Sequence, residues 1–307
     1  MSLVTVGTTL VLVPALLAAA LLWAAGRRDV PDSQTARAAR RHETLIAVAS
    51  TVAALATGVA VLSRPVAGGA AWLPVDGAPG LLWAVGPFVV ALAYCAVRAA
   101  GELTWPRPRG SVRSAPLTRR TVRDLGGRRL RWLLVTAGLL ALALVVTGMT
   151  AAPDGRSVPH PVYVTADGGV LRGASGPYPG WPYAVPLLVG LVLSLLAALA
   201  TLRVVARRAP LEDVPREHDD AVRRTSAARV VAGVQLCVGA TTALVLLLSG
   251  AAIANAGGPV SGFGETFRTP QLVAVAGGLA VVGIAVGLAS VVAVVTAVGH
   301  RPPERRP

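Results

Sequence analysis

Seven apolar stretches divide this chain, and each is long enough to cross the hydrocarbon core of a bilayer. A helical crossing needs about 20 apolar residues. The stretches are Leu3–Ala25, Thr44–Leu62, Leu81–Ala100, Trp132–Thr150, Tyr183–Val205, Val230–Ala254 and Leu272–Val298. Lipid offers no hydrogen-bonding partner to the backbone, so each stretch must satisfy its own polar groups as a helix. The sequence therefore predicts an all-α fold, a polytopic bundle of seven transmembrane helices.

The composition agrees with lipid as the main solvent of the chain. Hydrophobic residues make up 54% of the sequence and charged residues only 14%, whereas soluble domains carry about 25% charged residues. The connecting stretches reach about 30 residues, which is too short for an independent core. We therefore expect a single transmembrane domain over residues 1–299 and a disordered cytoplasmic tail over residues 300–307.

Arginine predicts the orientation of the chain. The formal net charge is +14, and because the sequence contains no lysine, all 29 cationic residues are arginine. Nearly all of them follow the first, third, fifth and seventh stretches; the exceptions are Arg64, Arg156, Arg172 and Arg268. Loops rich in positive charge stay cytoplasmic. This pattern places the N-terminus outside and the C-terminus inside, and the arginine-rich, lysine-free composition suggests a bacterial plasma membrane.

The first stretch is expected to remain as a helix rather than to be removed. Met1–Thr9 carries no charge, and the pair Arg27 and Arg28 follows the apolar run instead of preceding it. A secretory signal peptide has the opposite arrangement, with a basic segment first. If this stretch were nevertheless cleaved, six spans would remain.

The basic excess predicts a membrane partner and not nucleic acid. The arginines flank apolar spans and lack the interleaved aromatic residues of a platform that stacks single-stranded bases. Arginine near an inner leaflet is attracted to anionic headgroups. The arginine-rich segments fit either short surface helices or solvated loops. Acidic and basic residues four apart, Asp219 with Arg223 and Asp220 with Arg224, favour helices.

The spans carry little that could perform chemistry. No ionisable residue lies near a bilayer midplane, so the titratable relay of a proton-coupled carrier is missing, and without lysine there can be no retinal Schiff base. Cys95 and Cys237 lie within apolar spans and are interpreted as small buried residues. No two histidines share a helical face as a metal site would require. We expect no catalytic residue, no cofactor and no metal.

A few uncharged positions stand out within the spans. Gln235 is the strongest, with Thr241 on the same predicted helix. It is either a hydrogen-bonding link between helices or a polar point on a substrate path. Pro87, next to Gly86, is the best candidate for a hinge. Gly283-x-x-x-Gly287 matches the motif for close helix packing, within the bundle or against a partner chain.

Other residues are interpreted as anchors at the membrane surface. Arg98 and Arg203 lie at the inner ends of two spans, from which long cationic side chains can reach the headgroups. Trp181 and Tyr183 lie where the fifth span begins, and aromatic residues at that depth usually hold a helix at the interface.

The loop Ala151–Pro182 is the most distinctive connection in the chain. In it, Val162–Thr165 and Val170–Arg172 flank the Gly-rich turn Ala166–Gly169, which predicts a small β-hairpin. Three arginine-led helical hairpins also follow the first span. They fit an ancient internal repeat, and equally the likeness that biased composition creates by itself.

These observations favour a non-enzymatic accessory or scaffold membrane protein that packs against another membrane subunit. The alternative is a permease, or a subunit of one, that moves a neutral or amphipathic solute between kinked helices. A continuous polar groove through the bundle would favour the permease, and a dry bundle with an exposed Gly/Ala stripe would favour the scaffold.

Overall fold

The structure is a computed structural model and describes residues 34–63, 80–105, 121–208, 216–262 and 265–298. The predicted first span, Leu3–Ala25, and the predicted tail, residues 300–307, lie outside the described residues. Six long helices dominate the described part; they are α2 (Gln34–Leu62), α3 (Leu81–Leu103), α4 (Val122–Thr150), α5 (Trp181–Arg207), α6 (Arg216–Gly257) and α7 (Pro270–Val298). Each is long and apolar enough to cross a membrane.

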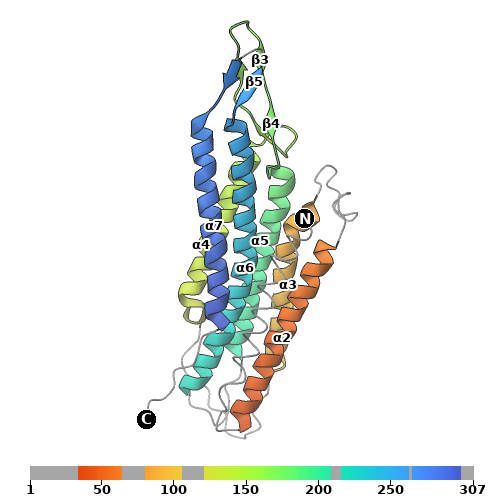
Figure 1. The fold of residues 1–307 in the computed structure, drawn as a ribbon. Helices are drawn as coiled ribbons and strands as arrows, with labels where there is room; N and C mark the ends of the chain where they lie inside the picture. The colour runs from red at the N-terminus through yellow and green to blue at the C-terminus, as the bar shows by residue number, and fades with distance from the viewer. Residues whose placement is uncertain (1–33, 64–79, 106–120, 209–215, 263–264, 299–307) are drawn as a thin grey trace.

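Helices that follow one another in the sequence alternate in direction, and α6 lies at the centre of the bundle (Figure 1). Helix α6 packs against α3, α4, α5 and α7, whereas α2 packs mainly on α3 and α7 mainly on α6. Contacts at both ends show that α2 and α3 run antiparallel: Val61 lies against Gly86, and His42 Nε2 donates to the Gly101 carbonyl at 3.0 Å. The helix ends therefore gather at two opposite ends of the molecule.

Three helices extend beyond the predicted spans at their N-terminal ends. In α2 and α6 the arginine-rich segments continue the membrane helix without a break, so the predicted surface helices or loops are instead extra turns. Helix α4 changes direction at Gly127, whose φ of 46° is in the left-handed region that glycine tolerates. A capping box precedes that turn: the Thr121 side chain accepts from the Asp124 N–H, and the Asp124 carboxylate accepts from the Thr121 N–H.

The end of the bundle opposite to the N-terminal ends of α2, α4 and α6 carries three short antiparallel strand pairs (Figure 1). The predicted hairpin is present as β2 (Tyr163–Val164) paired with β3 (Val170–Leu171), and Gly168 in its turn has a φ of 77°. The remaining pairs are β1 (Val158–Pro159) with β4 (Ala174–Ser175) and β5 (Val260–Gly262) with β6 (Glu265–Phe267). We call this end the strand end, and the opposite end the charged end.

The core between the two ends is apolar. Its largest cluster combines buried side chains of α3, α4, α5 and α6, including Phe88, Leu140, Leu187 and Val234. Helix α7 contributes little to it, because most of its large apolar side chains are exposed. The described part of the chain is thus a bundle of six helices, each long and apolar enough to cross a membrane, with a mainly apolar core and one peripheral, mostly uncovered helix.

Candidate functional site

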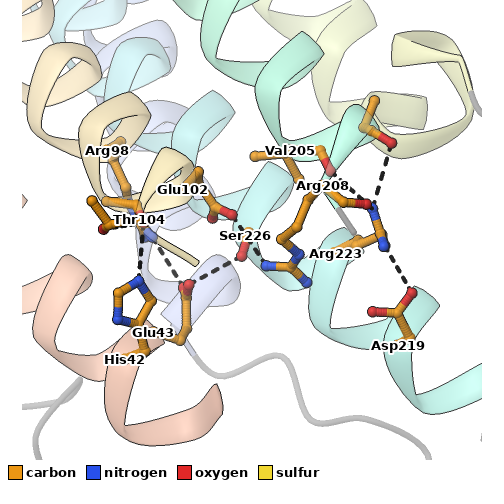
Figure 2. A network of polar contacts seen from close by, with 12 residues as sticks. His42, Glu43, Arg98, Glu102, Thr104, Val205, Arg208, Asp219, Arg223 and Ser226 are labelled. Carbon is orange, nitrogen blue, oxygen red and sulfur yellow. Dashed lines mark hydrogen bonds and ion pairs between the residues drawn. The ribbon is translucent and has the colours of Figure 1, made fainter. Parts of the chain in front are cut away.

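Buried ion pairs at the charged end join four segments of the chain (Figure 2). The side chains come from α2, from α3, from the end of α5 and from the N-terminal half of α6. The arginines are Arg98, Arg208, Arg223 and Arg229, and the carboxylates are Glu43, Glu102 and Asp219. We call these seven residues the ionic network. Because charges are costly to bury unless they are paired, their arrangement fixes how the helices meet.

Glu43 joins α2 to the rest of the bundle. Its Oε1 accepts from Arg98 Nη1 at 3.0 Å and from Arg229 Nη1 at 2.8 Å. Its Oε2 accepts from Ser226 Oγ at 3.1 Å. Tyr94 completes this group, since its hydroxyl accepts from Arg98 Nε at 3.4 Å and donates to the Arg229 carbonyl at 3.0 Å. One carboxylate thus holds two guanidinium groups from two different helices.

A second pair links the ends of α3 and α5. Arg208 Nη1 donates to Glu102 Oε2 at 3.1 Å, and both side chains are almost completely buried. The Arg208 guanidinium also lies over the Trp105 ring, with Cζ 3.7 Å from the ring centroid. Trp105 packs with Ala39, Ile46 and Val222 in a small apolar cluster beside the network. Trp105 and this apolar cluster therefore help to bury the ion pair between Arg208 and Glu102.

Arg223 closes the C-terminal end of α5. Its Nη1 lies within hydrogen-bonding distance of the Val205, Ala206 and Arg208 carbonyls, the shortest distance being 2.7 Å to Arg208. Its Nε donates to Asp219 Oδ2 at 2.9 Å. The last carbonyls of a helix lack partners within the helix and carry partial negative charge. A buried arginine on α6 thus satisfies the end of α5.

Arg98 differs from its predicted role as an anchor at the membrane surface. It is only 1% exposed and is directed into the bundle towards Glu43. The position of Arg98 at the end of a span suggested that its side chain would reach the headgroups. Its guanidinium instead pairs with Glu43 of α2, inside the bundle. Arg203, by contrast, is exposed on α5, as a surface anchor would be.

Gln235 lies in a second polar cluster, halfway along the bundle. Its Nε2 donates to Thr136 Oγ1 at 3.0 Å and to Ser290 Oγ at 3.1 Å, so it joins α4, α6 and α7. Both hydroxyls donate to carbonyls of their own helices and are left to accept from the amide. This is the arrangement of a link between helices. Thr241 is buried and donates only to the Cys237 carbonyl of its own helix.

The predicted packing motif meets α6 of the same chain. A Cβ at Gly283 would lie 3.2 Å from the Ala243 carbonyl oxygen, and one at Gly287 would lie 3.4 Å from the Ala243 Cβ. Close approach of this kind gains dispersion contacts between helices. Pro87 lies in the second turn of α3, which continues through it to Leu103.

The two aromatic residues predicted as anchors open α5 at the strand end. Trp181 is the first residue of the helix and is 45% exposed. Its ring lies against buried Gly148 of α4, where a Cβ would come within 2.8 Å of the ring. Tyr183 is half-buried and packs against the main apolar core. Both residues pack against other parts of the bundle, and their role as anchors at the membrane interface stays a prediction.

Sequence reasoning missed most of the ionic network. Asp219 and Arg223 carried a local signal, since they are four apart on one helix. Neither Glu43 nor Glu102 was singled out in the sequence, and nothing indicated which arginine each would meet. Within the described ranges, no group of three or more His, Cys, Asp or Glu residues could hold a metal ion.

Comparison with protein-family models, with curated proteins and with solved structures found no match for this chain.

Proposed function

We propose that this chain is a non-enzymatic accessory or scaffold protein of a bacterial cell membrane, where it acts by packing against another membrane component. Six helices of sufficient length and apolarity support a multi-pass protein. Arginine at the charged end supports an orientation with that end in the cytoplasm. The observation that carries the scaffold role is the largely uncovered surface of α7.

Helix α7 offers a long apolar face to its surroundings. Its exposed large apolar residues are Val273, Val275, Val281, Val282, Ile284, Leu288, Val291, Val292 and Val295. Among them, Gly277 and Gly278 are open, since a Cβ at either would meet nothing within 4 Å. Small residues let a neighbouring helix approach closely in lipid, where packing rather than hydrophobicity drives association. This face therefore suits a transmembrane helix of a partner.

The charged end suits an anionic membrane surface. The exposed arginines in the helix segments at this end include Arg41, Arg123, Arg128, Arg131, Arg203 and Arg224. Each arginine near an anionic leaflet contributes about 1 kcal/mol. Attraction to anionic headgroups would hold the helix ends at the inner face of the membrane while α7 remains available within the bilayer.

Photo-crosslinking in native membranes tests the scaffold role. A photoreactive residue is placed at Val281 or Leu288 on α7. Leu142 on α4 is the control position, because its side chain is similarly exposed, at 62%. We expect a discrete protein adduct from both α7 positions and none from the control. Adducts with lipid alone at all three positions, at native expression levels, would contradict the proposal.

A permease for a neutral or amphipathic solute is the second candidate, and one observation favours it. Gln235 is 6% exposed, yet its Oε1 has no hydrogen-bond partner among the described residues. A buried acceptor of this kind could meet a donor group of a passing solute. Solute flux into vesicles containing the purified chain, abolished by Gln235→Leu and retained by Thr241→Val, would replace the scaffold role with this one.

A further inference from the structure

One edge of the Arg208 guanidinium is buried without a partner. Nη1 is occupied by Glu102, whereas Nε and Nη2 form no hydrogen bond within the described part of the chain. These two nitrogens share the side of the guanidinium that binds a carboxylate or phosphate through two parallel hydrogen bonds. Buried N–H groups left without partners are unfavourable, so this edge favours an oxyanion that can reach it.

Trp105 supplies another unused donor in the same stacked pair. Its indole Nε1 is also buried without a partner among the residues described, and the Trp105 residue is only 6% exposed. The indole ring lies 3.7 Å from Arg208 Cζ and thereby restrains the guanidinium. Arg208 follows the last residue of α5, and Trp105 lies two residues beyond the end of α3. The pair is thus located where the membrane helices end.

The charge of the network also favours an anion. Its four guanidinium groups face three carboxylates, and the one positive charge in excess lies at Glu43, which pairs with both Arg98 and Arg229. The carbonyls at the end of α5 would repel an anion, but Arg223 already donates to them. Glu102 is the carboxylate nearest to Arg208 and is held at Nη1, away from the free edge (Figure 2).

We propose that the Nε–Nη2 edge of Arg208 and the indole N–H of Trp105, which is stacked on it, together bind one phosphate oxyanion. Two sources share this chemistry: the phosphate of an anionic lipid headgroup and free inorganic phosphate. The lipid source rests on the proposed position of the charged end at a membrane surface, and the free-phosphate source does not. Unlike the attraction of exposed arginines to a charged leaflet, this site depends on the shape of one guanidinium group.

The test compares two charge-conserving variants of neighbouring residues in the purified, delipidated full chain. Arg208→Lys keeps the charge but removes the two-pronged edge, and Arg207→Lys makes the same change at an exposed position. Binding of phosphatidylglycerol and of phosphatidylcholine is followed by native mass spectrometry, and binding of radiolabelled inorganic phosphate by equilibrium dialysis. We expect Arg208→Lys to weaken binding by about tenfold or more, since a point charge cannot replace a bidentate contact.

The outcomes separate the source of the phosphate from the existence of the site. Phosphatidylglycerol bound without competition by inorganic phosphate assigns the lipid source, and binding of inorganic phosphate assigns the free ion. Failure of both ligands to bind, or equal affinity of Arg208→Lys and wild type, overturns the site. Equal losses in both lysine variants also overturn it, and would leave general attraction to anionic lipid intact.

Trp105→Phe provides an independent variant that keeps the stacked ring and removes only the indole N–H. We expect this variant to bind phosphate about threefold more weakly, because it loses one hydrogen bond to a charged group. Should Arg208→Lys unfold, this variant decides the question, and unchanged affinity in Trp105→Phe would then overturn the proposal.

Discussion

The charged end and the strand end of this molecule are held together by different interactions. At the charged end, buried guanidinium and carboxylate groups from α2, α3, α5 and α6 pair across helices. At the strand end, short backbone ladders and an aromatic contact join two loops: Tyr163 stacks on Phe267 at 4.9 Å between centroids, and its hydroxyl lies 2.6 Å from Thr269 Oγ1. One end depends on a few buried ion pairs between helices, the other on several weaker contacts within and between two loops.

This difference indicates how a failure at each end would spread. Loss of the Glu43 carboxylate leaves Arg98 and Arg229 without a counter-charge, and every helix that they touch is affected. Loss of a contact at the strand end exposes a loop that already faces its surroundings, and the helices keep their core. We therefore expect global effects from the charged end and local effects from the strand end.

Glu43→Gln tests the charged end and has the largest expected effect. The substitution preserves volume and removes the charge that Arg98 and Arg229 share. Breaking a buried ion pair from one side costs about 3–5 kcal/mol, and the loss should appear as a lower free energy of unfolding in detergent. Helix α2 should separate first, because Glu43 provides its ionic contacts with α6.

Glu217→Gln is the matched control, since Glu217 is an exposed acid near the start of α6. Its effect should stay within about 0.5 kcal/mol. If Glu43→Gln lowered the free energy of unfolding no more than the control does, the ionic network would not stabilise the fold. The expected difference between global effects at the charged end and local effects at the strand end would then be wrong.

Phe267→Ala tests the strand end. It removes the ring that stacks on Tyr163 and so weakens the contact between the loop before α5 and the loop before α7. An aromatic pair of this type contributes about 0.5–1.5 kcal/mol beyond its buried area. We expect faster hydrogen exchange in both loops and little change in exchange of the helices. Val164→Ala, at a residue that is 64% exposed, should leave both loops unchanged.

The same contrast explains which parts of the structure could be predicted. Helices and the β2–β3 hairpin follow from apolar length and from a Gly-rich turn, both of which are local. The pairing of Asp219 with Arg223 was also local, four residues apart. Glu43 and Arg229 are separated by 186 residues, and no pattern in one sequence identifies such a partner. Arg98 was misplaced for that reason.

Asp154 offers the smallest and most local test, through pH. The Arg156 N–H and then the Ser157 hydroxyl and N–H donate to its carboxylate, and these hydrogen bonds hold the pKa of Asp154 below its ordinary value of 3.8. A carboxyl whose pKa is lower in the folded state stabilises the fold above its unfolded pKa and ceases to do so as the pH falls through the folded one.

At neutral pH, the loop after α4 should therefore be cleaved by a protease more slowly in the wild type than in Asp154→Asn. The advantage should narrow once the pH drops below about 4, where the unfolded chain begins to take up the proton, and vanish when the folded carboxyl is protonated as well. The charged end should respond to pH in the same way in both proteins, since Asp154 lies at the opposite end of the bundle. An advantage that persisted unchanged into strong acid would mean that the three hydrogen bonds do not depend on the charge of Asp154, and that the strand end is held by backbone geometry alone.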